Sequence, residues 1–254
     1  MPRPERAFRT PALILRRREF GEADRILTVL TPNHGRRDVI AKGARKPISQ
    51  RTGHVELYTL AEMQIGVGRD LDVAAQATLV KPWLPLRENL QRGAYASYVA
   101  ELVIRFTGDA GDEPASLFEL LDMTFEALSN DTDPRLAVRH YEMRLLDIVG
   151  FRPELQTCVL SQEPIRPRDQ YFSFEGGGVV SPEAAQQGGG ALVPLSLDAL
   201  KVLRYIQRTP YDDVKVLKVG ASLHAELERV LLGYIVYLLE RRLESVDFIR
   251  RVRE

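Results

Sequence analysis

The sequence predicts an α+β protein of several domains, in which a small N-terminal β-barrel precedes a bundle of helices. Up to Leu79, apolar residues alternate with polar ones, which is the period of a strand with one buried face. Beyond Pro82-Trp83-Leu84-Pro85 the apolar period lengthens to about 3.6, that of a helix. With 254 residues, 44% hydrophobic and 28% charged, the chain has an ordinary globular composition and enough length for more than one core.

Five short strands are predicted in the first domain, residues 1–81. Turn residues separate the apolar runs, and Gly68-Arg69-Asp70 predicts a hairpin between the last two. No helix in this region is long enough to cover a sheet. We therefore expect the strands to close into a barrel, which leaves no exposed edge. The predicted strands are 12–15, 26–30, 39–41, 55–67 and 71–79.

A helical bundle is predicted for residues 82–150 and 196–254. Asp133-Pro134 marks the start of one helix, because Asp is a good N-cap and Pro suits the first helical position. Glycine and proline interrupt the bundle at residues 151–195, an insert with strands expected at 171–174 and 179–180. The first helical stripe consists of Tyr95, Tyr98, Val99, Leu102, Val103 and Phe106.

No active site is predicted. The triple glycines at 176–178 and 188–190 lack the Lys-Ser/Thr pair that a phosphate-binding loop needs. The four histidines are scattered, and neither His-Glu-x-x-His nor Gly-x-Ser-x-Gly occurs. We therefore expect a protein that is not an enzyme, with no catalytic residue and no cofactor.

Charge is distributed very unevenly along this neutral chain. Thirteen basic and five acidic side chains lie between Met1 and His54, a net charge of +8, so the remainder carries −8. Clustered cations produce a field suited to a polyanion such as DNA. We predict DNA binding through phosphate contacts, although a solvated basic surface is the open alternative. The predicted DNA-binding residues are Arg36, Arg37, Lys42, Arg45, Lys46 and Arg51.

Other residues of this region are less suited to the site. Its aromatics are sparse, namely Phe8, Phe20 and Tyr58, which favours phosphate contact over base stacking and predicts little sequence preference. The tripeptide Arg16-Arg17-Arg18 is left out, because alternation in a strand sends Arg17 to the face opposite its neighbours. If the loop cations are not the site, the C-terminal arginines are the alternative: Arg241, Arg242, Arg250, Arg251 and Arg253.

The sequence favours a cytoplasmic protein. Its one cysteine, Cys158, excludes an intramolecular disulfide. The N-terminus lacks the apolar core of a secretory signal, and the apolar run Val230–Leu239 is half the length that a membrane span requires.

Several motifs resemble the bacterial recombination mediator RecO family. The resemblance begins with EFGEADR at 19–25, TPNHGR at 31–36 and AKGAR at 41–45. It continues through YVAEL at 98–102 and LFELL at 117–121. Two later runs complete it, at 142–155 and 241–248, so that it spans nearly the whole chain.

The resemblance implies an N-terminal OB-fold, a helical domain and an embedded zinc-ribbon-like insert. It also implies a non-enzymatic role in recombinational DNA repair. Members bind single- and double-stranded DNA, anneal strands and help RecA load onto DNA coated with single-strand-binding protein, usually with RecR. It places the chain in the bacterial cytoplasm, at the nucleoid when it acts.

One departure concerns zinc. Many family members carry two Cys-x-x-Cys pairs in the insert, and here the four positions are Cys158, Ser161, Ser181 and Ala184. One thiol cannot hold structural zinc. We therefore predict a metal-free insert that is ordered because four of its side chains pack against the helical bundle. These side chains are Phe172, Phe174, Val179 and Val180.

A second function stays open at this stage. The stripe from Tyr95 to Phe106 could leave a groove on the bundle for the acidic tail of single-strand-binding protein, or for RecR. The chain would then be a protein-interaction adaptor with DNA contact secondary. The simpler reading is that these side chains are core.

Overall fold

The computed structural model describes residues 7–44, 55–108, 114–188 and 190–253. It divides the chain into two compact units, Met1–Asn130 with Ser245–Glu254, and Asp131–Glu244. This division groups two long helices with the barrel, whereas the sequence predicted all long helices as one bundle. The predicted domain boundaries stay a proposal.

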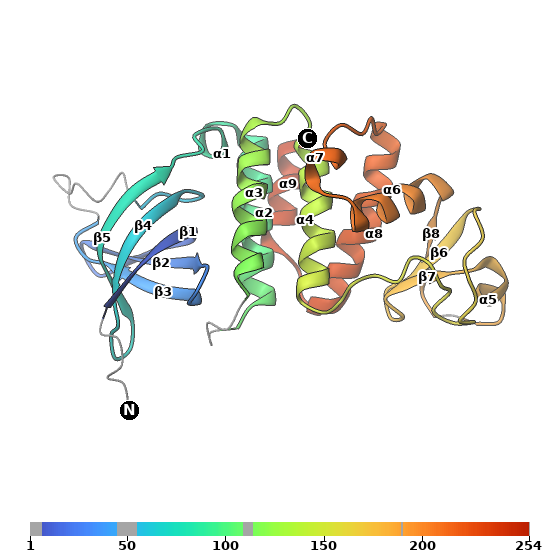
Figure 1. Cartoon of the computed structure of the whole chain (residues 1–254), viewed down its shortest axis with the longest axis horizontal. Helices are drawn as coiled ribbons and strands as arrows, with labels where there is room; N and C mark the ends of the chain where they lie inside the picture. The colour runs from blue at the N-terminus through green and yellow to red at the C-terminus, as the bar shows by residue number, and fades with distance from the viewer. Residues whose placement is uncertain (1–6, 45–54, 109–113, 189, 254) are drawn as a thin grey trace. The chain divides into compact units, whose positions relative to one another are not determined.

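The first unit contains a closed barrel of five strands, as predicted (Figure 1). The strands follow one another around the barrel in the order β1-β2-β3-β5-β4, with only β3 and β5 parallel. Inward apolar side chains fill the interior, which explains the alternation seen in the sequence. The strands are β1 (Ala7–Phe20), β2 (Asp24–Thr31), β3 (Gly35–Ala41), β4 (Leu60–Gly66) and β5 (Asp72–Lys81).

A β-bulge at Leu15 changes which side chains of β1 face inward. Ile14 lies opposite Val29, but Arg16 lies opposite Thr28, so β1 carries one extra residue at this point. Before the bulge the even-numbered side chains point into the barrel core, as Ile14 does. After it the even-numbered side chains point outward.

Two long helices, a short one before them and a C-terminal one belong to the first unit. The helix α2 begins after Asn89, whose Oδ1 accepts a hydrogen bond from the Arg92 N–H at 3.0 Å. The last helix is tied to α2 where the Ser245 N–H donates to Glu101 Oε2 at 2.9 Å. These helices are α1 (Pro85–Glu88), α2 (Leu90–Phe106), α3 (Ala115–Asn130) and α9 (Glu244–Arg253).

The predicted stripe on α2 is core. Each of Tyr95, Tyr98, Val99, Leu102 and Val103 is at most 2% exposed. The stripe therefore leaves no open groove for a partner tail, and the simpler of the two sequence readings holds for these residues.

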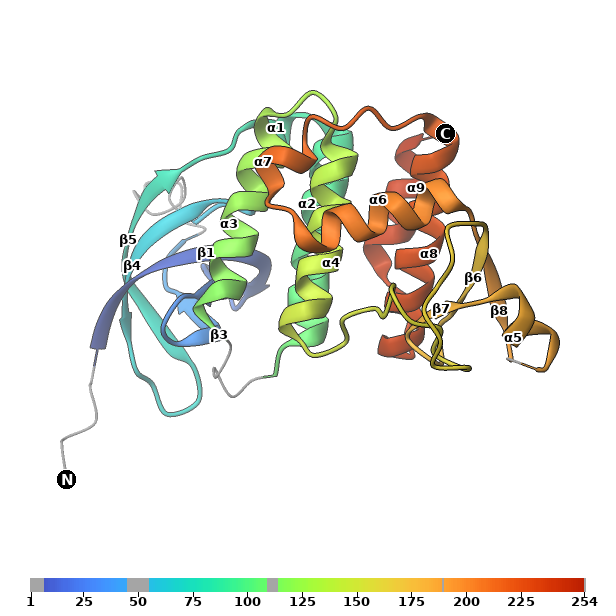
Figure 2. The same ribbon diagram turned by 45° about the vertical axis from the view of Figure 1, so that its right-hand side comes forward.

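The second unit joins helices to a small antiparallel sheet, with strand order β7-β6-β8 (Figure 2). Its first helix starts as predicted, since Asp133 Oδ1 accepts from the Arg135 N–H at 3.0 Å. The helices are α4 (Pro134–Ile148), α5 (Pro182–Gln186), α6 (Leu197–Arg208), α7 (Tyr211–Val214) and α8 (Ala221–Leu239). The strands are β6 (Gln170–Ser173), β7 (Gly178–Val180) and β8 (Leu192–Leu195).

The insert packs on α8 through two phenylalanines, as predicted. The Phe172 ring is fully buried, 5.5 Å from the Tyr234 ring in an edge-on arrangement. Phe174 lies over Gly233, where an added Cβ would come within 2.3 Å of Phe174 Cζ. Glycine at 233 therefore permits this close approach. Val179 and Val180 are also fully buried.

Replacing Gly233 with alanine should lower the free energy of unfolding by about 1–3 kcal/mol, because overpacking forces the ring or the helix to move. Without the clash, alanine in a helix would be favourable by up to about 1 kcal/mol. Thermal or urea denaturation checks the sign. The atoms that would clash are Cζ, Cε1 and Cε2 of Phe174, all absent from leucine. Adding Phe174→Leu should therefore recover part of the loss, and additive losses would contradict this account.

Candidate nucleic-acid interface

Arg36 connects β3 to the end of α2. Its Nε and Nη2 donate to the Gly108 carbonyl at 3.2 and 2.9 Å, and Nη2 also lies 3.5 Å from the Thr107 carbonyl. A cation at the C-terminal end of a helix satisfies its last carbonyls and complements the helix dipole. This predicted DNA-binding residue therefore has a structural role in the first unit.

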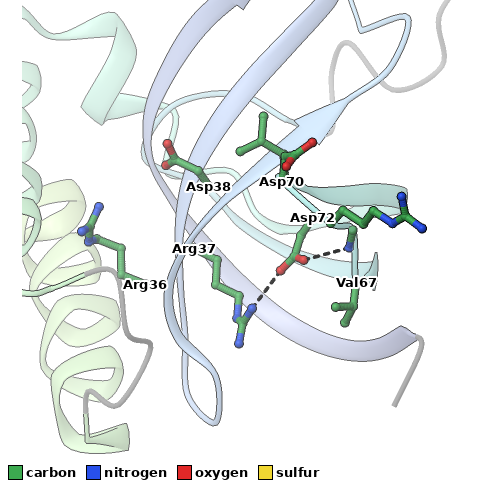
Figure 3. A pocket seen from close by; sticks show the side chains of 9 residues that line it. Arg36, Arg37, Asp38, Val67, Asp70 and Asp72 are labelled. Carbon is green, nitrogen blue, oxygen red and sulfur yellow. Dashed lines mark hydrogen bonds and ion pairs between the residues drawn. The ribbon is translucent and has the colours of Figure 1, made fainter. Parts of the chain in front are cut away.

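Arg37 points to the opposite face of β3 (Figure 3). Its Nη1 lies 2.9 Å from Asp72 Oδ2, its Nε donates to the His34 carbonyl at 3.1 Å, and its guanidinium lies 5.7 Å from the centre of the Phe8 ring. Two of its three guanidinium nitrogens therefore already have partners.

The pocket beside Arg37 is not suited to phosphate. Three arginines and three aspartates line it, so its formal charge is zero. The Asp72 carboxylate also accepts a hydrogen bond from the Gly68 N–H at 3.2 Å, which fixes the β4–β5 turn. The charged lining residues are Arg36, Arg37, Arg69, Asp38, Asp70 and Asp72.

Lys42 lies at the other end of β3 and is exposed. It is five positions beyond Arg37, about 17 Å along a strand. Its turn is held where the Gly43 N–H donates to Asp24 Oδ1 at 2.7 Å. The structure therefore does not bring Lys42 together with Arg36 and Arg37. The other three predicted residues, Arg45, Lys46 and Arg51, lie outside the described residues.

Two arginines that the sequence reading had not selected meet at one carboxylate. Arg17 lies opposite Leu27, a barrel-core residue, and forms an ion pair with Glu56. Arg25 Nη1 lies 3.7 Å from the other Glu56 oxygen and has no hydrogen-bond acceptor in the described part of the chain. The group carries one excess positive charge. Only the folded structure reveals it, because the two arginines are distant in sequence from Glu56.

The C-terminal arginines are divided between the two units. Arg241 and Arg242 are exposed residues of the second unit, whereas Arg250 and Arg251 are exposed on α9 of the first. Arg251 Nε donates to the Asp247 carbonyl at 3.2 Å. The side chain of Arg253 lies outside the described part of the chain.

The four positions at which the resemblance implies zinc ligands do not supply a zinc site. Three of them meet: Cys158 Sγ accepts N–H groups from Ser161 at 3.5 Å and Ser181 at 3.4 Å. The fourth, Ala184, packs in the same apolar cluster as Cys158 and offers only a methyl group. The Ser181 hydroxyl accepts the Ala184 N–H and caps α5. One thiol and two hydroxyls do not fit tetrahedral zinc.

Elsewhere the described residues contain no group of three or more His, Cys, Asp or Glu side chains that could hold a metal ion. None of the helices in the described ranges is both long and apolar enough to cross a membrane.

The chain has a closed N-terminal barrel, a basic N-terminal segment and a helical C-terminal part. Comparison with known families assigns this arrangement to a class of DNA repair proteins. The family model "Recombination protein O N terminal" matches residues 6–83, and "Recombination protein O C terminal" matches residues 87–247. The chain belongs to the RecO family of DNA repair proteins, as the sequence motifs had indicated.

Curated relatives named "DNA repair protein RecO" cover almost the whole chain. The relative from Dehalococcoides mccartyi strain 195 is 36% identical over 234 residues, 92% of this chain and 91% of the relative. The one from Roseiflexus sp. strain RS-1 is 37% identical over 250 residues, 98% and 87% of the two chains. The one from Symbiobacterium thermophilum is 32% identical over 248 residues, which are 97% of this chain and 98% of the relative.

Proposed function

We propose that this chain is a non-enzymatic recombination mediator. It binds single- and double-stranded DNA through phosphate contacts, promotes annealing of complementary strands and helps RecA load onto DNA coated with single-strand-binding protein. Membership of the RecO family supports the repair role. The observation that carries the DNA-binding part is the net charge of +8 between Met1 and His54 in a neutral chain.

Phosphate capture requires no reactive group. Each phosphate neutralised by Lys or Arg releases condensed counterions, which drives binding without reading the sequence. Two strands held on one basic surface repel each other less, while base pairing alone selects the complement. The mechanism therefore needs cations and no bond chemistry.

Among the six predicted residues, the four beyond the end of β3 are the main contacts in this proposal. Arg36 and Arg37 contribute long-range charge, while their guanidinium groups hold α2 and Asp72. The four are Lys42, Arg45, Lys46 and Arg51.

The remaining parts of the proposal follow from the family. RecR and single-strand-binding protein are the proposed protein partners, and RecA is a direct or indirect one. The proposed site of action is the nucleoid in the bacterial cytoplasm, and no membrane is among the proposed partners. The insert keeps a zinc-ribbon-like outline without metal, with the apolar cluster around Cys158 in place of the ion.

An annealing assay tests the proposal. Two complementary strands with a donor and an acceptor dye should anneal faster when the protein is added, without nucleoside triphosphate. The acceleration should disappear at about 1 M salt, where counterion release no longer favours binding. Annealing at the rate of the free strands under low salt would contradict the mediator role.

An adaptor function remains the second candidate, although the α2 stripe no longer supports it. A partner tail would have to bind elsewhere than at Tyr95–Phe106, since most of these side chains are buried.

A further inference from the structure

The barrel exposes one aromatic ring. Of the three aromatics in its described part, Phe8 is 7% exposed and its ring stacks on His34 at 3.8 Å between centroids. Tyr58 is half-buried, and its ring lies 5.9 Å from that of Phe125. Phe20 differs, because 48% of its surface is exposed. Its ring is therefore available to a partner.

Phe20 shares an outward face with two arginines because of the bulge at Leu15. Beyond the bulge, every second residue of β1 points outward. These residues are Arg16, Arg18 and Phe20, and all three are exposed. Successive members of this set lie about 6.6 Å apart along the strand. Without the bulge, the even-numbered residues would continue into the core, as Ile14 does.

This face presents two exposed cations. Arg18 Nη2 lies 3.3 Å from Asp38 Oδ2, but the Arg18 side chain remains 55% exposed, where an ion pair is weak and screened. Arg16 makes no ion pair with any residue in the described ranges. Asp24 lies opposite Phe20 and accepts the Gly43 N–H, so the two arginines lie beside two aspartates, each of which already has a partner inside the protein.

We propose that Arg16, Arg18 and Phe20 form a contact for single-stranded DNA, in which Phe20 stacks on a base and the two arginines take phosphates. An isolated exposed apolar residue would need no explanation. Here the ring continues a row of cations, which is the combination that single-strand sites use. Bases inside a duplex offer no free face, so this contact selects unpaired strands. The inference rests on the proposed DNA-binding function and adds strand selectivity to it.

Substitutions of Phe20 separate stacking from charge. Phe20→Leu should weaken binding of a labelled oligothymidylate by about five- to a hundredfold, measured by fluorescence anisotropy. The slope of log affinity against log salt should not change, because no phosphate contact is lost. Affinity for a duplex of the same length should also stay the same. Phe20→Tyr keeps a ring of similar size and should bind the single strand like the wild type.

Substitutions of the arginines give the complementary result. Arg16→Gln and Arg18→Gln should each make the single-strand salt slope shallower by about 0.7. Arg9→Gln is the matched control on the same strand, because Arg9 is 72% exposed and paired with Glu62 at 2.9 Å on the other side of the bulge. Its slope should match that of the wild type.

The outcomes distinguish this inference from the proposed function. Wild-type protein that binds neither strand form would overturn DNA binding itself. Wild-type protein that binds while Phe20→Leu binds the single strand equally well would overturn only the stacking contact. Equal losses on single strand and duplex would also overturn it, since they would show that Phe20 does not select unpaired bases.

Discussion

A variant that loses the four cations beyond the end of β3 should bind a labelled single strand roughly a hundredfold more weakly at 0.15 M salt. The four residues, replaced with glutamine, are Lys42, Arg45, Lys46 and Arg51. Each lost phosphate contact removes about 0.7 from the salt slope, so the slope should become shallower by up to about 2.8. Anisotropy titrations at several salt concentrations measure both quantities.

A matched control separates local contact from net charge. Replacing four exposed cations of the second unit with glutamine changes the net charge by the same amount. These four are Lys201, Arg208, Lys215 and Lys218. Lys201 and Lys215 are paired with aspartates at the surface, where such pairs contribute little to stability. This control should retain most of the affinity. Equal losses in both variants would contradict a site on the barrel.

Arg36 and Arg37 are left out of that variant for a structural reason. Alanine at Arg36 would remove the donors to the Gly108 carbonyl, and alanine at Arg37 would leave Asp72 without its ion pair. A loss of DNA binding could then come from a disturbed barrel. Restricting the change to the four cations avoids this ambiguity.

Glu142→Gln should have the largest effect on stability, a loss of about 3–5 kcal/mol in the free energy of unfolding. Glu142 is fully buried on α4, and its Oε1 lies 3.1 Å from Nη2 of Arg139, whose side chain is 6% exposed. Neutralising the carboxylate leaves the arginine charge inside the protein without its ion pair. Urea denaturation followed by circular dichroism measures the loss.

Two controls define the source of this effect. Adding Arg139→Met to Glu142→Gln should recover stability relative to the single variant, because the isolated charge is gone. Asp198→Asn breaks an exposed pair with Lys201 at the same i,i+3 spacing and should lose under about 1 kcal/mol. If all three variants lost equal stability, burial would not be the cause.

Alternation predicted the barrel well, because strand period and glycine turns depend on residues that are close in sequence. The bulge at Leu15 could not be predicted, since it depends on how β1 pairs with β2. The bulge determines that Arg16 and Arg18, and not Arg17, point outward. Alternation correctly separates Arg17 from its neighbours, but the two excluded arginines share their exposed face with Phe20.

The same rule, applied to Arg36 and Arg37, would have sent the two side chains to opposite faces of β3. The sequence reading grouped them by charge instead. What each contacts, the end of α2 or Asp72, depends on segments more than thirty positions away. Charge content is visible in a sequence, but the convergence of charges depends on register and on distant partners.

The insert shows a similar limit. Its first two strands, observed at 170–173 and 178–180, were predicted at 171–174 and 179–180 from local apolar runs. The third strand, Leu192–Leu195, was missed because Pro194 weakens the strand signal. Proline is tolerated there since β8 lies at the edge of the sheet. The apolar stripe on α2 was visible, but only the structure shows that its side chains are covered.

The salt dependence of single-strand binding by the wild-type protein tests the central claim most directly. If the barrel cations capture phosphate, log affinity should fall linearly with log salt, with a slope of about −0.7 for each contact and several contacts in total. The slope should lie near −3 or be steeper if the four cations beyond β3 all bind. A slope near zero, or no binding at low salt, would contradict the account.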